Sequence, residues 1–266
     1  MDIYQRELRS LKVRGLIAAS DQILVLAAGQ TDRQAMLDAD LQNVTISNLD
    51  YQDGQKDYAP YDWKRLDAEK LALADNSYDW VIIHAGLHHI AVPAMGVCEM
   101  FRVARKGILC FEARDSLLMK CAVATGLTPE YEMEHAFLTD GLNGGYRNGP
   151  IPNYVFRWTE REFEKTLNCF APTHRHTFFY SYGFRHPVER FSMVKSPIYR
   201  MAGLIISKLT KVAELVIPKQ GNQFAFGALK NTALQPWLND DLSFRKSYLS
   251  KKYDKATFKT KPLVSD

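Results

Sequence analysis

The 266-residue sequence lacks the features that mark several classes of protein. Its four cysteines are scattered and none forms a C-x-x-C pair, which argues against a zinc site or a disulfide framework. The first residues are acidic and polar, so no secretory signal is expected. A net charge of +4 is too small for the concentrated positive field of a nucleic-acid-binding protein. These absences favour a cytoplasmic protein with reduced thiols, no bound metal and no nucleic-acid partner.

The sequence also lacks an uninterrupted apolar run that could cross a bilayer. The most hydrophobic stretch, 198–217, is broken by Arg200, Lys208, Lys211 and Glu214. Its apolar residues recur at helical spacing, which predicts a helix over 198–216 that covers a sheet, with membrane-surface contact as the less favoured interpretation. After about residue 231 the chain turns polar and rich in lysine, so a domain over 1–231 and an extension over 232–266 are expected.

What the sequence does contain is an alternation of strands and helices. The apolar runs at 23–28 and 80–84 are typical of parallel strands that are covered on both faces. Further strands are expected at 43–48, about 63–66, 107–112, 177–180 and 223–229. Helices are expected at 2–19, 32–40, 93–105 and 160–168. This order predicts one α/β domain with a doubly wound, mostly parallel seven-stranded Rossmann-like sheet, which binds ligands at the carboxyl ends of its strands.

The most informative segment is 66–89, which reads LDAEKLALADNSYDWVIIHAGLHH. It resembles the corresponding stretch of the class I S-adenosylmethionine-dependent methyltransferases typified by ubiquinone and menaquinone C-methyltransferases. The similarity extends over about 23–112, through the Lys106–Gly107 turn. The resemblance implies S-adenosylmethionine as cofactor, methyl transfer as activity and an antiparallel last strand. It also divides the domain into a cofactor half, 20–112, and an acceptor half, 113–231.

The expected cofactor contacts follow successive strands of the sheet. In the family, an acidic residue and a small one, here Asp67 and Ala68, face the adenine. Asn48 and Asp50 stand where side chains can accept hydrogen bonds from ribose hydroxyls, although both residue types also form ordinary turns. The full set of expected cofactor residues is Ala28, Gly29, Gln30, Asn48, Asp50, Asp67, Ala68, Glu69, His84, Ala85 and Gly86.

The turn after the first strand departs from the family pattern. The family opens with Asp/Glu-x-Gly-x-Gly-x-Gly, whereas this chain has Ala27 at the acidic place, keeps Gly29, and has Thr31 and Arg33 at the other glycine places. The cofactor's ammonium group therefore needs a different partner. A catalytically inactive methyltransferase-like binding module is one alternative. A nicotinamide-dependent oxidoreductase is a second, disfavoured because the turn lacks G-x-G-x-x-G.

The sequence gives less information about the residues that contact the methyl acceptor. His88 and His89 are candidate general bases because imidazole titrates near neutral pH, with a structural role as the alternative. The segment 144–154 is rich in helix breakers and is either a lid or a connecting loop. Candidate acceptor contacts are Glu112, Arg114, Tyr146, Arg147, Asn153 and Tyr154. A small molecule, a saccharide or a lipid-linked compound would each suit them.

Overall fold

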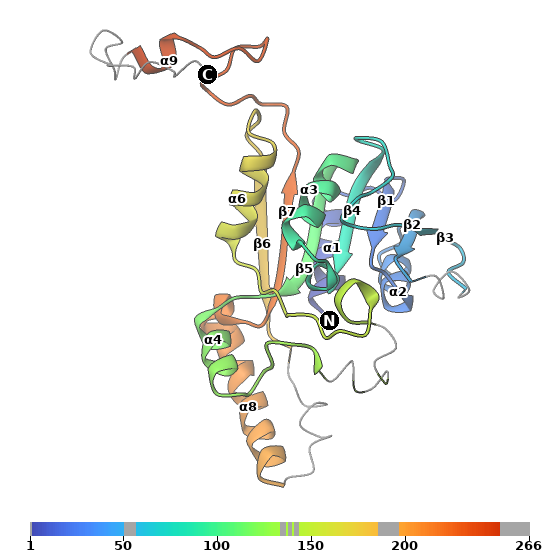
Figure 1. Ribbon diagram of the computed structural model, residues 1–266, viewed down its shortest axis with the longest axis vertical. Helices are drawn as coiled ribbons and strands as arrows, with labels where there is room; N and C mark the ends of the chain where they lie inside the picture. Colours follow the sequence, from blue (N-terminus) through green and yellow to red (C-terminus); the bar gives the residue numbers. More distant parts are fainter. Residues whose placement is uncertain are drawn as a thin grey trace, which may run out of the picture.

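A computed structural model describes residues 2–50, 57–133, 137, 140, 144–185 and 197–250. Its centre is a seven-stranded sheet in the order β3-β2-β1-β4-β5-β7-β6 (Figure 1). The strands are β1 (Gln22–Leu26), β2 (Asn43–Asn48), β3 (Asp62–Arg65), β4 (Tyr78–His84), β5 (Ala104–Ala113), β6 (Thr177–Gly183) and β7 (Gln223–Leu229). Pairing is parallel from β3 to β5, and β7 is antiparallel to both neighbours. The predicted fold, including its antiparallel last strand, is confirmed.

Helices cover both faces of the sheet (Figure 1). They are α1 (Ile3–Val13), α2 (Gln30–Asp38), α3 (Pro93–Val103), α4 (Leu117–Ala124), α6 (Glu160–Phe170), α8 (Pro197–Val216) and α9 (Ser247–Ser250). Ile23 and Val25 of β1 pack with residues of α1 and α2. Leu24 and Leu26 face the other way and pack with residues of α3 and α6. Because side chains alternate along a strand, a strand covered on both faces is apolar throughout, which explains the continuous run in the sequence.

Some helices have boundaries that differ from the predicted ones. The helix expected over 2–19 ends at Val13, where the chain turns through Gly15 with a φ of 68°. The helix expected from 32 begins at Gln30, because Gly29 is its N-cap and donates its backbone N–H to Asp32 Oδ2 at 2.9 Å. Helix α4 has no counterpart in the prediction. Ser116 caps it by accepting the N–H of Met119 at 3.2 Å. Within the described residues, no helix is both long and apolar enough to span a membrane.

Asp79 connects three strands at the edge of the sheet opposite their carboxyl ends. Its side chain is buried, accepts the Gln22 N–H at 3.0 Å and pairs with Arg105 at 2.9 Å. Burial disfavours the charged form, but these partners prevail and lower the pKa of Asp79. The Asp79 carboxylate therefore joins the starts of β1, β4 and β5.

Replacing Asp79 by Asn should lower the free energy of unfolding by about 1–3 kcal/mol, because the amide loses the charge that pairs with Arg105. Urea unfolding at neutral pH measures this, and exposed Asp75→Asn is the control, with an expected change below about 0.5 kcal/mol. The lowered pKa means that the carboxylate stabilises the fold above about pH 4 and loses this effect as pH falls. Equal stability of D79N and wild type at neutral pH would contradict the assignment.

Candidate functional site

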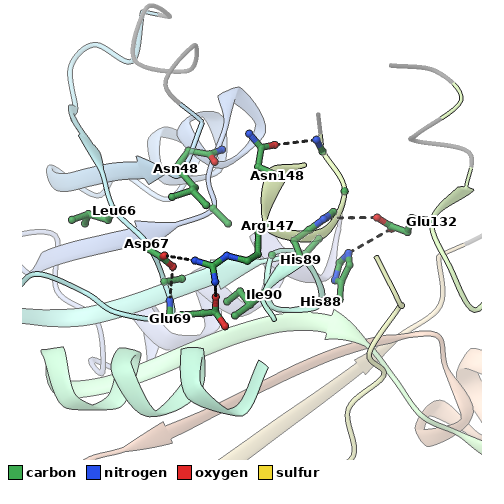
Figure 2. Close-up of a pocket in the computed structure, with 17 residues that line it drawn as sticks. Asn48, Leu66, Asp67, Glu69, His88, His89, Ile90, Glu132, Arg147 and Asn148 are labelled. Carbon is green, nitrogen blue, oxygen red and sulfur yellow. Dashed lines mark hydrogen bonds and ion pairs between the residues drawn. The ribbon is translucent and has the colours of Figure 1, made fainter. Parts of the chain in front are cut away.

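The turns after β1 and β4 approach each other closely at the carboxyl edge of the sheet. Ala27 and Ala85 have φ angles of 48° and 51°, in the left-handed region that residues with a Cβ rarely adopt. A Cβ on Gly86 would lie 2.6 Å from the Cβ of Ala27, so glycine is needed at this contact. The two turns form one side of a cavity of about 430 Å³ (Figure 2).

The cavity, called here the first cavity, gathers predicted cofactor residues from separate segments of the chain. Those that line it are Asn48, Asp67, Ala68, Glu69, Ala85 and Gly86. From the first turn, Ala27 forms the wall, while Ala28 is buried in the core. Asp50 donates its backbone N–H to Asn48 Oδ1 at 3.2 Å, so the two residues form a local turn at the end of β2.

Asp67 takes part in both a loop turn and a long-range ion pair. Its Oδ1 accepts the Glu69 N–H at 3.0 Å, and its Oδ2 lies 3.2 Å from Arg147 Nη2. Arg147 Nη1 also lies 3.4 Å from the Glu69 carboxylate (Figure 2). Arg147 belongs to the 3₁₀ turn η3 (Tyr146–Asn148) of the predicted acceptor loop. The structure therefore places this guanidinium against the expected adenine residues, and its role as an acceptor contact stays a prediction.

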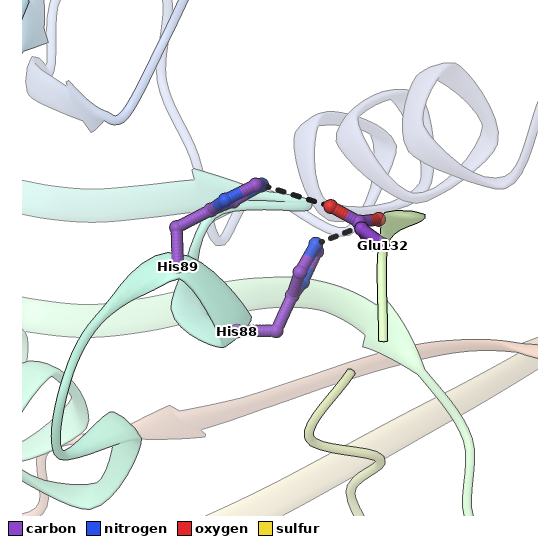
Figure 3. Close-up of side chains that lie close together, drawn as sticks. All are labelled: His88, His89 and Glu132. Atoms are coloured by element: carbon purple, nitrogen blue, oxygen red, sulfur yellow. Dashed lines mark ion pairs between the residues drawn. The ribbon is translucent and has the colours of Figure 1, made fainter. Parts of the chain in front are cut away.

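His88, His89 and Glu132 line the first cavity, and their side chains lie close together (Figure 3). His88 Nε2 lies 3.5 Å from Glu132 Oε1, and His89 Nε2 lies 3.6 Å from Glu132 Oε2. Glu112, near the end of β5, completes the cluster. One of its oxygens lies 2.6 Å from His88 Nδ1, and the other accepts the Leu87 N–H at 2.6 Å.

The charges in this cluster determine its protonation. Burial alone would lower the pKa of His88, but the carboxylates of Glu112 and Glu132 raise it to about 10. The pKa of Glu132 is about 2, because charged His88 outweighs the opposing effect of burial. Burial and the neighbouring charge of His88 lower the pKa of His89. A positive charge on His88 thus lies between two carboxylates, beside a neutral His89.

Glu132 reaches the cluster through Asn153. The Glu132 N–H donates to the Asn153 carbonyl at 3.0 Å, and Asn153 Nδ2 donates to the His88 carbonyl at 3.3 Å. Asn153, an expected acceptor contact, is only 2% exposed, so it is placed to position its neighbours. Sequence reasoning missed Glu132 because its segment carries neither periodicity nor a motif.

The remaining expected acceptor residues are dispersed. Arg114 is buried, pairs with Glu160 at 3.0 Å and stacks on the rings of Tyr182 and Phe224. This network anchors β5 to the start of α6, so Arg114 is not the open acceptor contact that the sequence predicts. Tyr146 and Tyr154 are exposed, and their acceptor roles stay predictions.

A second cavity adjoins the first, and a third adjoins the second. The second, of about 270 Å³, shares Ala85, His88 and Glu132 with it. The third, of about 600 Å³, shares His84 with the second and contains Asp32. The buried Asp32 Oδ1 has no hydrogen-bond partner among the described residues and lies 3.6 Å from His84 Nδ1. Sequence reasoning missed Asp32 as well, although it lies three residues after Gly29.

Comparisons with known proteins identify a methyltransferase domain in the chain. Residues 22–111 match the family model of a methyltransferase domain. A chain of the complex between the Haloferax volcanii Trm112 methyltransferase activator and the putative methyltransferase is 12% identical, with a TM-score of 0.52 over 86% of this chain and 98% of that one. A possible histamine N-methyltransferase from Thermotoga maritima is 13% identical, with a TM-score of 0.49 over 86% and 89%. A search of the curated proteins found no match.

The family match runs from β1 into β5 and includes the residues that line the first cavity on the sheet side. This match disfavours the alternative that the chain is a nicotinamide-dependent oxidoreductase. The likeness to the Haloferax volcanii chain shows the fold alone. Residues 22–111 thus form a methyltransferase domain of the kind that uses S-adenosylmethionine as its cofactor.

Proposed function

We propose that the chain transfers a methyl group to a small-molecule acceptor bound in the second cavity. The observation that carries this proposal is the wall shared by the first and second cavities, made by Ala85, His88 and Glu132. Bound S-adenosylmethionine supplies an electrophilic methyl group, and the chain's own contribution is to align the acceptor and exclude water. The second cavity, at about 270 Å³, lies near the lower limit of roughly 300 Å³ for ligand pockets, which favours a small molecule over a saccharide chain or a lipid-linked compound.

The lining of the second cavity indicates an acceptor with an apolar body and a polar or anionic group. Met119 and Phe224 supply apolar surface, while Arg157 and Arg185 supply guanidinium groups. Arg157 donates to the Pro129 carbonyl at 2.7 Å, which fixes its orientation, and its Nε is buried without a partner among the described residues. A carboxylate or phosphate on the acceptor would suit these donors.

The residues present also fit the cofactor. Asp67 would accept a hydrogen bond from the adenine amino group, and Asn48 with Asp50 would hold the ribose. Asp32, whose buried Oδ1 lies 3.6 Å from His84 Nδ1, would supply the carboxylate that Ala27 lacks and would pair with the ammonium group. His84 beside Asp32 belongs to the same end of the site.

Methyl-labelled S-adenosylmethionine should label the low-mass metabolite fraction of a cell extract, rather than its lipid or macromolecular fractions. Met119→Trp should abolish this labelling, because Met119 lines the second cavity, with S-adenosylhomocysteine affinity within about a factor of two of wild type. Leu118→Trp is the matched control, since exposed Leu118 lies on the same helix. Label in another fraction would overturn the acceptor class, and no label in any fraction would support an inactive binding module.

Asp67→Ala should weaken S-adenosylhomocysteine binding by about 1–3 kcal/mol, the usual cost of removing one partner of a buried hydrogen bond. Isothermal titration calorimetry measures it. Arg147→Ala is the control, because it removes the ion pair with Asp67 but keeps the carboxylate. Its affinity should stay within about a factor of two of wild type. Equal losses in both variants would show that the ion pair, and not an adenine contact, is responsible.

Asp32→Asn removes the charge at position 32 while keeping an oxygen that can accept the Gly29 N–H. S-adenosylhomocysteine affinity should fall by about 1.5–3 kcal/mol, the range for a hydrogen bond to a charged group. The same loss should appear when binding is measured by fluorescence quenching or by calorimetry, without turnover. Asp38→Asn, at an exposed position of the same helix, should bind like wild type. Wild-type affinity in D32N would remove Asp32 from the site.

A further inference from the structure

Two histidines and a carboxylate converge at the wall between the first and second cavities (Figure 3). The nearest ligand atoms of His88, His89 and Glu132 all lie within 4.8 Å of one another. In the part of the chain that the structure describes, no other group of three or more histidine, cysteine or acidic side chains meets in this way. His174 and His176 have ring centroids 6.3 Å apart and belong to no such group.

The spacing in this cluster suits an ion between the side chains better than direct contact. The two imidazole-to-carboxylate distances, 3.5 and 3.6 Å, exceed the usual length of a hydrogen bond, about 2.7–3.2 Å. Around a zinc ion with bonds of about 2.0–2.2 Å, neighbouring ligand atoms lie roughly 3–3.5 Å apart. Small side-chain adjustments would therefore bring all three ligands into coordination distance.

The surroundings of His88 match those of a metal-ligating histidine. Such a residue usually directs its other ring nitrogen to a carboxylate, which fixes the tautomer and the ring orientation. Here Glu112 lies 2.6 Å from His88 Nδ1, so Nε2 is left to face Glu132 and the cavities. Glu112 is itself held by the Leu87 N–H. Metal binding would displace the Nε2 proton that makes His88 cationic, and the two carboxylates around His88 would then balance the charge of the ion.

We propose that His88, His89 and Glu132 bind one divalent transition-metal ion of the class that accepts two imidazoles and one carboxylate, such as zinc, cobalt, manganese or ferrous iron. Three protein ligands leave coordination positions open, and His88 and Glu132 also line the second cavity. An ion at this position would orient an acceptor that carries oxygen donors. That role rests on the proposed function, whereas binding of the ion does not. The sequence predicts no metal site. Glu132 is remote from the two histidines in the sequence, so no ligand spacing indicates this group there.

Cobalt titration of the full-length protein, stripped with EDTA and dialysed, tests the site. We expect a visible d–d absorption band that saturates at one equivalent, and competition by zinc. His89→Gln and Glu132→Gln should abolish the band, with circular dichroism confirming that each variant is folded. Glu112→Gln should weaken cobalt binding by roughly 10–100-fold, as for other partners of a ligating histidine. His174→Gln, in the second histidine pair, should bind cobalt like wild type.

Absence of a saturable cobalt band in the wild-type protein would overturn the proposal. Cobalt binding by E132Q that is as tight as in the wild type would also overturn it. A loss of cobalt binding in H174Q equal to that in E132Q would do the same. The two proposals are separated by measuring S-adenosylhomocysteine affinity and methyl transfer with and without EDTA. Cobalt binding without transfer to any small molecule would overturn the proposed function alone. Transfer by EDTA-treated protein that binds no cobalt would overturn the metal site alone.

Discussion

Glu112 holds the 3₁₀ turn η2 (Leu87–His89) against the end of β5 through two contacts of 2.6 Å, one to the Leu87 N–H and one to His88 Nδ1. Both contacts lie in a buried environment, where a charge-assisted hydrogen bond is strong and an unpaired carboxylate is costly. The turn can therefore hardly leave β5 without breaking this pairing. The position of His88, and with it the wall between the first and second cavities, follows from this carboxylate.

A second constraint is the close packing of the turns after β1 and β4. Ala27 and Ala85 both adopt left-handed backbone conformations, and Gly86 fits against Ala27 only because it lacks a Cβ. Such conformations cost a residue with a Cβ about 1–3 kcal/mol, and they persist where the surrounding structure holds the backbone in place. Parallel pairing of β1 with β4 supplies this fixation. The turn after β1 keeps only one of the glycines of the family pattern, Gly29. The carboxyl edge of the sheet nevertheless borders a cavity.

The sequence predicts the sheet well because strand patterns depend on local burial. β2 and β7 begin and end at the predicted residues, and the segment 66–89 identifies the expected adenine side of the site. Asp32 and Glu132 escape prediction for a different reason. Their relevance arises from partners far away in the chain: His84 for Asp32, and His88 with Asn153 for Glu132. Periodicity and motifs carry no information about such contacts between irregular segments.

The predicted division of the chain into a cofactor half and an acceptor half is less strict in space than in sequence. Arg147 comes from the acceptor half, yet its guanidinium pairs with Asp67 and Glu69 of the cofactor half. Glu132 likewise comes from the acceptor half and meets two histidines that follow β4. Both contacts join residues that follow β5 to residues that precede it. A ligand that displaced Arg147 from Asp67 would remove an ion pair that holds η3, so binding in the first cavity and the position of η3 would be energetically coupled.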